Sequence, residues 1–409
     1  MARSWVEWRC VMRGAINLLL VLMLAVNLRP LLTSVGPLLE PMRASTGLGY
    51  QQAALLTALP VLCMGLVPLL QPWLRRWISE HGGMLGGLGA IALACLWRLQ
   101  LDSAWALIAS AVLGGLGVAV VQGMMPGLVN RWFPKRLAPS MGLYSAALMS
   151  GGGLAAVLGP RISEHVGQWQ AGLGVWAAPA LLAVLAWAAL RPRHSVASLG
   201  GGGGGHWFGT RRAWLLAVYF GLINGGYTSM VAWLPAYHLE HGGTAQGGGD
   251  LVGVMTLLQI TGALGLPLLL RRFADRRPGL WLALTVQLVG FAGLLLAPAQ
   301  AIELWVGMIG FGLGACFSLS LTLTLEHLKS PGEAGSLAAF VQGIGFIITG
   351  MVPYITGWLR DSSGDFQASW MLLTATVLAM LLVTACFAPR GYATAIARPA
   401  AGGQAVRLN

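Results

Sequence analysis

The stretch AINLLLVLMLAVNLRPLLTSVG at residues 15–36 decides the class of this protein. It is apolar over the length of helix, about 20 residues, that crosses a hydrocarbon core about 30 Å thick. Arg29 is the charged residue inside it, and Pro30 follows directly. The stretch therefore predicts a membrane-spanning helix that carries a charge and a break in its interior.

Apolar stretches of similar length continue along the chain. Hydrophobic residues make up 56% of the 409 positions and charged residues 9%, against about 25% charged in soluble domains. In lipid a segment must satisfy its own backbone hydrogen bonds, so each stretch predicts a helix. We expect an all-α membrane protein with twelve transmembrane helices, near 15–36, 51–71, 84–101, 104–128, 139–160, 171–190, 213–236, 251–270, 279–298, 302–325, 334–357 and 368–388.

The net charge of +12 is explained by the orientation of these helices. Of the 25 Lys and Arg residues, we place Arg43, Arg98, Arg161 and Arg360 outside and Arg29 within the first span, which leaves twenty on the cytoplasmic side. Such an excess is the positive-inside rule, and basic loops also attract anionic lipid. Both termini are therefore expected in the cytoplasm, and the charge requires no nucleic-acid partner.

A glycine run divides the chain into two parts. Gly200 to Gly205 lie between arginines that follow the sixth span and precede the seventh, which is typical of a flexible linker. We expect an N-terminal six-helix bundle at 1–190, a cytoplasmic linker at 191–212, a C-terminal bundle at 213–389 and a cytoplasmic tail at 390–409.

The two bundles show a weak internal repeat. An offset of 197 places Gly115, Gly117 and Pro134 over Gly312, Gly314 and Pro331. Parallel six-helix repeats with a binding site between them at mid-membrane are an architecture of secondary transporters. The glycines themselves, including the run Gly151-Gly152-Gly153, are expected to let helices pack closely.

Arg29 is the side chain that most needs a partner. We find no acidic residue in the middle of a span, and a central arginine costs about 2.5 to 3.5 kcal/mol to insert. Arg29 lies about fourteen residues into its helix, roughly 21 Å from the cytoplasmic end. Pro30 frees the carbonyl of Val26, which loosens the helix at this point. Arg29 is therefore predicted to bind an anion; the alternative is a structural arginine held by carbonyls of neighbouring helices.

The other predicted substrate-binding residues are polar or aromatic and lie within spans 1, 4, 5, 7 and 11. They are Asn27, Thr33, Gln122, Tyr144, Asn224, Tyr227, Trp233 and Gln342. Gln122, Tyr144, Gln342 and also Gln259 are explained equally well as side chains that bridge two helices.

The sequence gives less support to proton coupling, to metal binding and to catalysis. His327 with Glu326 is the titratable pair near a span in the second half, although solvation at a helix end also explains it. Two of the four Glu-His pairs fall on each side of the membrane, so they predict no metal site. We find neither H-E-x-x-H nor a carboxylate pair within the bilayer, and the five cysteines lack a C-x-x-C spacing. We therefore expect no enzyme activity, no metal and no cofactor.

Six segments in both halves resemble the cyanate and 2-nitroimidazole transporter family of the major facilitator superfamily. They are NLRPLLTSVGPLL (27–39), ALLTALPV (54–61), YSAALMSGGGL (144–154), VYFGLINGGY (218–227), AWLPAY (232–237) and VQGIGFII (341–348). The superfamily signature after the second span is degenerate here at residues 70–76, whereas the second half retains Asp275-Arg276-Arg277.

The resemblance implies a secondary active transporter in the bacterial inner membrane that works by alternating access. It implies import of a small monovalent anion, with cyanate the first choice, and efflux of nitroimidazole-like or other small aromatic compounds as the alternative. A coupling proton or an exchanged anion would be needed for uptake, and we expect a monomer in the lipid bilayer. A membrane receptor or scaffold would normally carry an added soluble domain, and no connection here exceeds about 25 residues.

Overall fold

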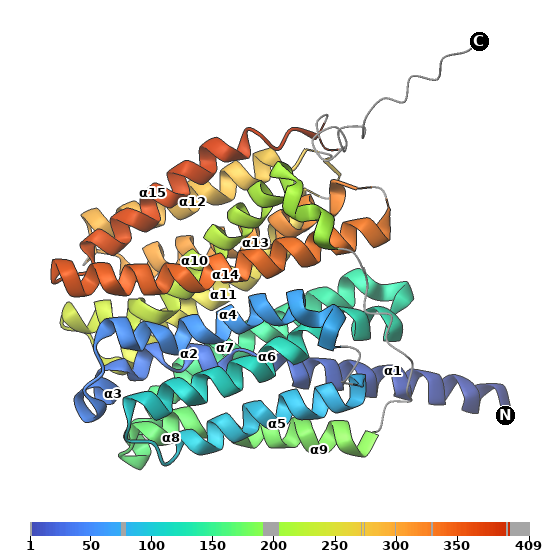
Figure 1. Ribbon diagram of the computed structural model, residues 1–409, viewed down its shortest axis with the longest axis horizontal. Coiled ribbons are helices and arrows are strands. Elements are labelled where there is room, and N and C mark those ends of the chain that lie inside the picture. The colour runs from blue at the N-terminus through green and yellow to red at the C-terminus, as the bar shows by residue number, and fades with distance from the viewer. Residues whose placement is uncertain are drawn as a thin grey trace, which may run out of the picture.

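A computed structural model describes residues 2–74, 79–190, 204–270, 272–273, 275–298, 300–328, 330–389 and 392. This part of the chain is helical, and its long helices lie side by side along one direction (Figure 1). α1 begins and α15 ends at one end of the bundle, which we call the termini face, and α3 lies at the opposite end, the far face (Figure 1).

Each predicted span corresponds to a helical segment. The N-terminal half contains α1 (Ala2–Val26), α2 (Pro30–Thr33), the 3-10 helix η1 (Gly36–Leu38), α3 (Leu39–Thr46), α4 (Tyr50–Leu74), α5 (Glu80–Arg98), α6 (Ala104–Trp132), η2 (Pro134–Arg136), α7 (Leu137–Val166), α8 (Trp169–Gly174) and α9 (Ala177–Leu190). The C-terminal half contains η3 (Gly204–Gly209), α10 (Arg211–Glu240), α11 (Ala245–Leu269), α12 (Arg277–Leu296), α13 (Ile302–Glu326), α14 (Pro331–Ser363) and α15 (Gln367–Thr384).

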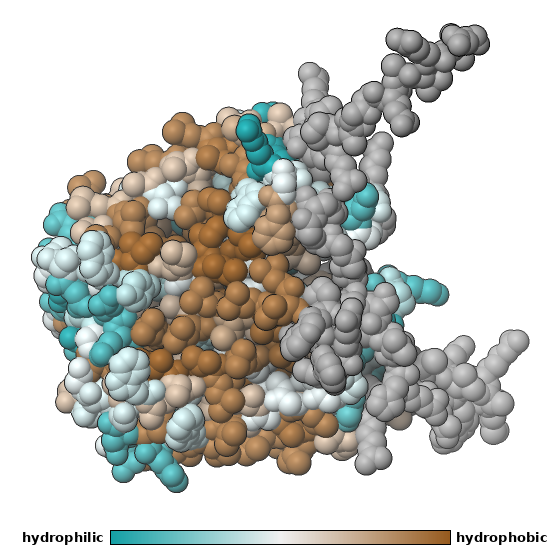
Figure 2. Space-filling model, viewed as in Figure 1, coloured by the Kyte–Doolittle hydropathy of each residue, from teal (hydrophilic) through white to brown (hydrophobic). Residues whose placement is uncertain are grey.

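The segments match the thickness of a bilayer. Within the described part of the chain, eleven are long and apolar enough to cross a membrane. α5 runs alongside α6 as a further crossing, and the polar first turn with Glu80 and His81 makes it less apolar than the others (Figure 1). A broad apolar band covers the visible side of the molecule between its two ends, as expected for a surface that faces lipid (Figure 2).

The first span is interrupted where the sequence predicts it. α1 ends at Val26, and α2 begins at Pro30 because proline has no backbone N–H to continue the helix. The freed carbonyl of Val26 lies against Gly151 of α7, where a Cβ atom would be 2.1 Å from the carbonyl oxygen. Only a glycine at position 151 allows this close approach of α7 to the break in the first span.

The predicted linker and tail lie mostly outside the described residues. Positions 191–203, 390, 391 and 393–409 fall there, including Gly200 to Gly203. Gly204 and Gly205 form part of η3, so the end of the glycine run is helical instead of a flexible coil. Trp207 of η3 is buried and donates a hydrogen bond from Nε1 to Ser336 Oγ of α14, 3.0 Å away.

The two halves are bonded to each other at the far face. Tyr50 Oη donates to Glu240 Oε1 at 3.4 Å. Arg161 of α7 makes two parallel hydrogen bonds of 2.8 and 2.9 Å to the carboxylate of Asp250 on α11. The backbone N–H of Gln51 donates to Asp361 at 3.0 Å. We call these six residues the far-face latch.

The ion pairs that the structure describes at the termini face stay within one half. Glu80 at the start of α5 pairs with Arg131 near the end of α6. Arg276, just before α12, pairs with Glu326 at the end of α13. We call these pairs the termini-face clamps. They occupy corresponding helix ends in the two halves, but the acidic and basic residues are exchanged. The two halves therefore share the ion pair at this position although the residues differ.

Candidate functional site

The break in the first span places Arg29 between helices of both halves. Arg29 is the N-cap residue of α2, and 7% of its surface is exposed. Gly152 of α7 lies against it, since a Cβ atom at position 152 would be 3.2 Å from Arg29 Cβ. The small glycine therefore lets the Arg29 backbone sit against α7.

The guanidinium of Arg29 faces aromatic side chains. Its Cζ atom lies 5.8 Å from the ring centroid of Tyr227 on α10, a cation–π distance. Arg29 is also near enough to Tyr144 on α7 to interact with its phenol electrostatically. None of the hydrogen bonds or ion pairs among the described residues uses the Arg29 guanidinium. A structural arginine would be held by carbonyls, and this contact is absent from the described part of the chain.

Three buried polar atoms on neighbouring helices lack a hydrogen-bond partner. They are Tyr144 Oη, Gln122 Oε1 of α6 and Gln259 Oε1 of α11. An unsatisfied buried polar group costs about 1–3 kcal/mol, and most such groups in proteins are paired with protein or water. Of these three side chains, Tyr144 is the one that interacts with Arg29.

The other predicted polar residues are engaged with their own helices. Asn27 donates to Met23 O at 2.7 Å, Thr33 to Arg29 O at 3.1 Å and Asn224 to Phe220 O at 2.9 Å. Gln342 lies half-buried on α14 and makes none of the side-chain hydrogen bonds found among the described residues. These four residues stay predictions as substrate ligands, since no hydrogen bond among the described residues joins their side chains to the Arg29 guanidinium.

Trp233 lies with the far-face latch and not with Arg29. Its indole N–H donates to Thr356 Oγ1 at 2.9 Å, and its ring centroid lies 5.9 Å from that of Tyr50. Sequence reasoning placed Trp233 beside the polar part of its span, but six residues beyond Tyr227 the helix has risen about 9 Å. The contacts of Trp233 favour packing over substrate binding.

The charge count placed Arg98 on the outer side of the membrane, and this prediction is wrong. Only 1% of its surface is exposed, because its guanidinium lies inside the N-terminal half beside Leu31 and Ser110. The signal for this burial was present in the sequence, since Arg98 falls within the predicted third span and Ser110 within the fourth.

The proposed proton-coupling pair has other partners. Glu326 belongs to a termini-face clamp. His327 is buried, donates from Nδ1 to Leu323 O at 2.7 Å and accepts at Nε2 from Arg212 at 3.1 Å. Burial and the Arg212 charge lower the pKa of His327 to about 4. His327 is therefore neutral at pH 7, which suits its two hydrogen bonds better than proton transfer.

This geometry predicts an acid-sensitive contact at the termini face. In the folded protein Arg212, Glu326 and Tyr392 surround His327. In the unfolded chain His327 takes up a proton near pH 6.5, whereas in the folded protein it does so only near pH 4. Its contribution, roughly 1–3 kcal/mol, is present above pH 6.5 and is lost as the pH falls to 4. We expect thermal unfolding in detergent to show a smaller loss of stability on acidification for His327→Gln than for the parent. Parallel pH curves for the two proteins would contradict this.

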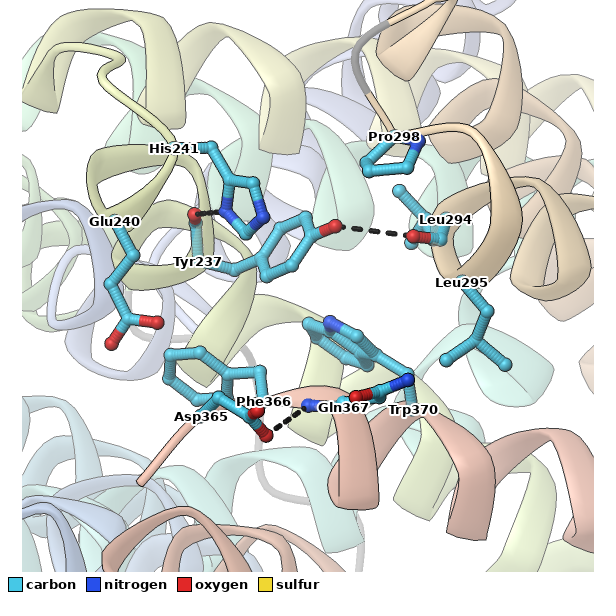
Figure 3. A pocket seen from close by; sticks show the side chains of 10 residues that line it. All are labelled: Tyr237, Glu240, His241, Leu294, Leu295, Pro298, Asp365, Phe366, Gln367 and Trp370. Atoms are coloured by element: carbon cyan, nitrogen blue, oxygen red, sulfur yellow. Dashed lines mark hydrogen bonds between the residues drawn. The ribbon is translucent and has the colours of Figure 1, made fainter. Parts of the chain in front are cut away.

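A cavity of about 180 Å³ opens elsewhere, at the far face of the C-terminal half (Figure 3). It lies between the ends of α10, α12 and the start of α15. Tyr237 spans it and donates to Leu294 O at 3.1 Å, and the carboxylates of Glu240 and Asp365 line it (Figure 3). The two carboxylates make this cavity unsuitable for an anion.

Comparison with known proteins places this geometry in a family. The sequence profile described as Major Facilitator Superfamily matches residues 18–350. The chain is 44% identical over 380 residues to the cyanate transport protein CynX of Escherichia coli, covering 91% of this chain and 97% of that protein. It is 30% identical over 371 residues to the 2-nitroimidazole transporter of Escherichia coli, covering 90% of this chain and 93% of the relative.

Two solved structures share the fold at low sequence identity. A point mutant of the nucleoside transporter NupG superposes with a TM-score of 0.71 at 14% identity, over 91% of this chain and 99% of that one. A bacterial homologue of the human lysosomal transporter Spinster gives a TM-score of 0.72 at 16% identity, over 95% and 99%. The chain is thus a multi-pass membrane transporter and not an enzyme, and it belongs to the Major Facilitator Superfamily.

Proposed function

We propose that this chain imports a small monovalent anion by alternating access and that cyanate is the substrate to test first. The observation that carries the proposal is Arg29, a buried guanidinium between the two halves without a carboxylate partner among the described residues. The 44% identical relative is named as a cyanate transport protein, which supports cyanate among the possible anions.

The physical reason for an anion is charge compensation. At an effective dielectric constant of about 20, two opposite unit charges about 4 Å apart attract by roughly 4 kcal/mol. An anion beside Arg29 would gain this energy, and the hydroxyl groups of Tyr144 and Tyr227 would donate hydrogen bonds to it. Cyanate has three heavy atoms, so binding is limited to about −4.5 kcal/mol, a dissociation constant on the order of half a millimolar.

Neutralisation of Arg29 would link binding to the conformational cycle. With the termini face in the cytoplasm, the far-face latch closes the outside, and the substrate leaves Arg29 toward the inside. The latch has to open before the next anion enters.

Moving an anion into a negative cell interior costs about 2.3 kcal/mol per 100 mV, so uptake needs proton symport, anion exchange or rapid consumption inside.

The test is uptake of labelled cyanate by proteoliposomes that contain the purified full chain. We expect saturable uptake above protein-free liposomes, half-saturated on the order of 0.1–1 mM, because a ligand of three atoms binds weakly. Excess unlabelled cyanate should suppress the signal, and labelled glucose serves as the control for leakage. Uptake equal to that of protein-free liposomes, with the protein folded, would reject cyanate as the substrate.

Efflux of 2-nitroimidazole-like compounds is the second candidate function. The contact of Arg29 with the Tyr227 ring favours it, since an aromatic nitro compound could stack on the tyrosine while its nitro group bonds the arginine. The 30% identical relative carries this substrate in its name. The same proteoliposomes, loaded with 2-nitroimidazole, distinguish the two functions by which compound crosses the membrane.

A further inference from the structure

Arg98 is a second buried arginine close to the break in the first span. It is the last residue of α5, and 1% of its surface is exposed. Its Nη1 atom donates to Leu31 O at 2.9 Å, and its Nε atom donates to Ser110 Oγ of α6 at 3.0 Å. Its Nη2 atom is buried without a hydrogen-bond partner. Burial removes water from the Arg98 guanidinium, and no carboxylate in the described part of the chain interacts with its charge.

The bond to Leu31 fixes the segment that carries Arg29. α2 spans only the four residues Pro30–Thr33, so its carbonyls have few amide donors from its own chain. Leu31 lies two residues after Arg29, and Arg98 ties its carbonyl to α5 and, through Ser110, to α6. The direction in which α2 holds Arg29 therefore depends on Arg98.

The charge of Arg98 matters beyond this hydrogen bond. A neutral amide side chain could donate to the Leu31 carbonyl without the cost of burying a charge, which is several kcal/mol for an ion without a counterion. A guanidinium at this place adds a second positive charge near the anion site, and among the described residues no acidic side chain pairs with it. In a low-dielectric interior such a charge acts over a longer distance than it would in water.

We infer that Arg98 is a positioning residue for Arg29 and a second source of the positive potential that selects anions. The inference rests on the proposed function in one respect, namely that the transported molecule is an anion. The positive potential itself is a property of the protein and is measurable without any substrate.

The first experiment measures the kinetics of cyanate uptake. Arg98→Gln keeps a donor for the Leu31 carbonyl and removes the charge that attracts the anion, so KM should rise about tenfold, which corresponds to about 1.4 kcal/mol. Vmax should change little. Arg98→Lys keeps the charge and should leave KM within about threefold of the parent. A parental KM in Arg98→Gln would overturn the inference.

The second experiment measures the potential at position 29 directly. In a chain with Arg29→Cys, Cys10→Ser and Cys386→Ser, the thiol is labelled with an anionic and with a cationic methanethiosulfonate. The ratio of the anionic to the cationic rate should fall about 100-fold when Arg98→Gln is added, because the two reagents differ by two unit charges, and it should hold with Arg98→Lys. This result stands even if cyanate is not transported, so failure of the proposed function is distinguishable from failure of this inference.

Ser110→Asp keeps the test decisive if Arg98→Gln does not fold. The new carboxylate would pair with Arg98 Nε and cancel its charge, while the bond from Nη1 to Leu31 O is kept. The labelling ratio should then fall as in Arg98→Gln. An unchanged ratio in a folded Ser110→Asp protein would show that the Arg98 charge does not reach the site.

Discussion

Arg29→Gln is expected to lower the initial rate of cyanate uptake at least about 100-fold. The glutamine keeps a polar side chain of similar length but removes the charge that compensates the anion, an attraction of roughly 4 kcal/mol at about 4 Å. The rate is measured in proteoliposomes, per amount of protein that elutes as a single folded species.

Two companion variants identify which property of Arg29 matters. Arg29→Lys keeps the charge but loses the planar pair of donors, so we expect an intermediate loss of about tenfold. Tyr227→Phe keeps the ring that faces Arg29 and removes the hydroxyl, and should lose less than Arg29→Gln. Uptake at the parental rate by Arg29→Gln would leave Arg29 with a structural role only.

Cross-linking the far-face latch is expected to lower the rate of cyanate uptake by more than about 90%. Arg161 and Asp250 lie on α7 and α11, one from each half, and their side chains are joined at 2.8 Å. Alternating access requires the halves to separate at this face once in each cycle. In Arg161→Cys with Asp250→Cys, a short bifunctional thiol reagent should block cyanate uptake, and a reductant that cleaves the bridge should restore it.

A matched pair within one half provides the control. Glu80 and Arg131 form a termini-face clamp inside the N-terminal half, which moves as a unit in this mechanism. Bridging Glu80→Cys to Arg131→Cys with the same reagent should leave most of the transport intact. If the bridged Arg161→Cys, Asp250→Cys protein transports at the parental rate, the far face does not need to open.

The fold could be predicted from sequence because the membrane makes each span independent. A lipid-exposed segment has to close its own backbone hydrogen bonds, so hydropathy alone located the helices after the first to within several residues. The first span, predicted at 15–36, begins earlier, at Ala2 of α1. The break at Pro30 followed from the missing N–H of proline, and the structure ends α1 at Val26 as expected. The glycine run at 151–153 was also predicted as a packing surface, although its partner, the Val26 carbonyl, was not.

The site was harder to predict because it depends on contacts between distant parts of the chain. Arg29 and Tyr227 were both proposed from sequence, but their approach to 5.8 Å depends on how the halves pack. Tyr50 and Glu240 are 190 positions apart, and Gln51 and Asp361 are 310 apart, so one sequence could not pair them. Arg98 was placed outside because it lies near the end of the predicted third span, whereas its side chain bonds to Leu31 inside the bundle.

The termini-face clamps also bear on how such a chain can recombine. Glu80 travels with Arg131 and Arg276 travels with Glu326, because each clamp is encoded within a single half. A hybrid made from one half of this chain and the complementary half of a relative would inherit one of these clamps whole and would separate the partners of neither. Such a hybrid therefore has to match its parents where the halves meet, as at the far-face latch.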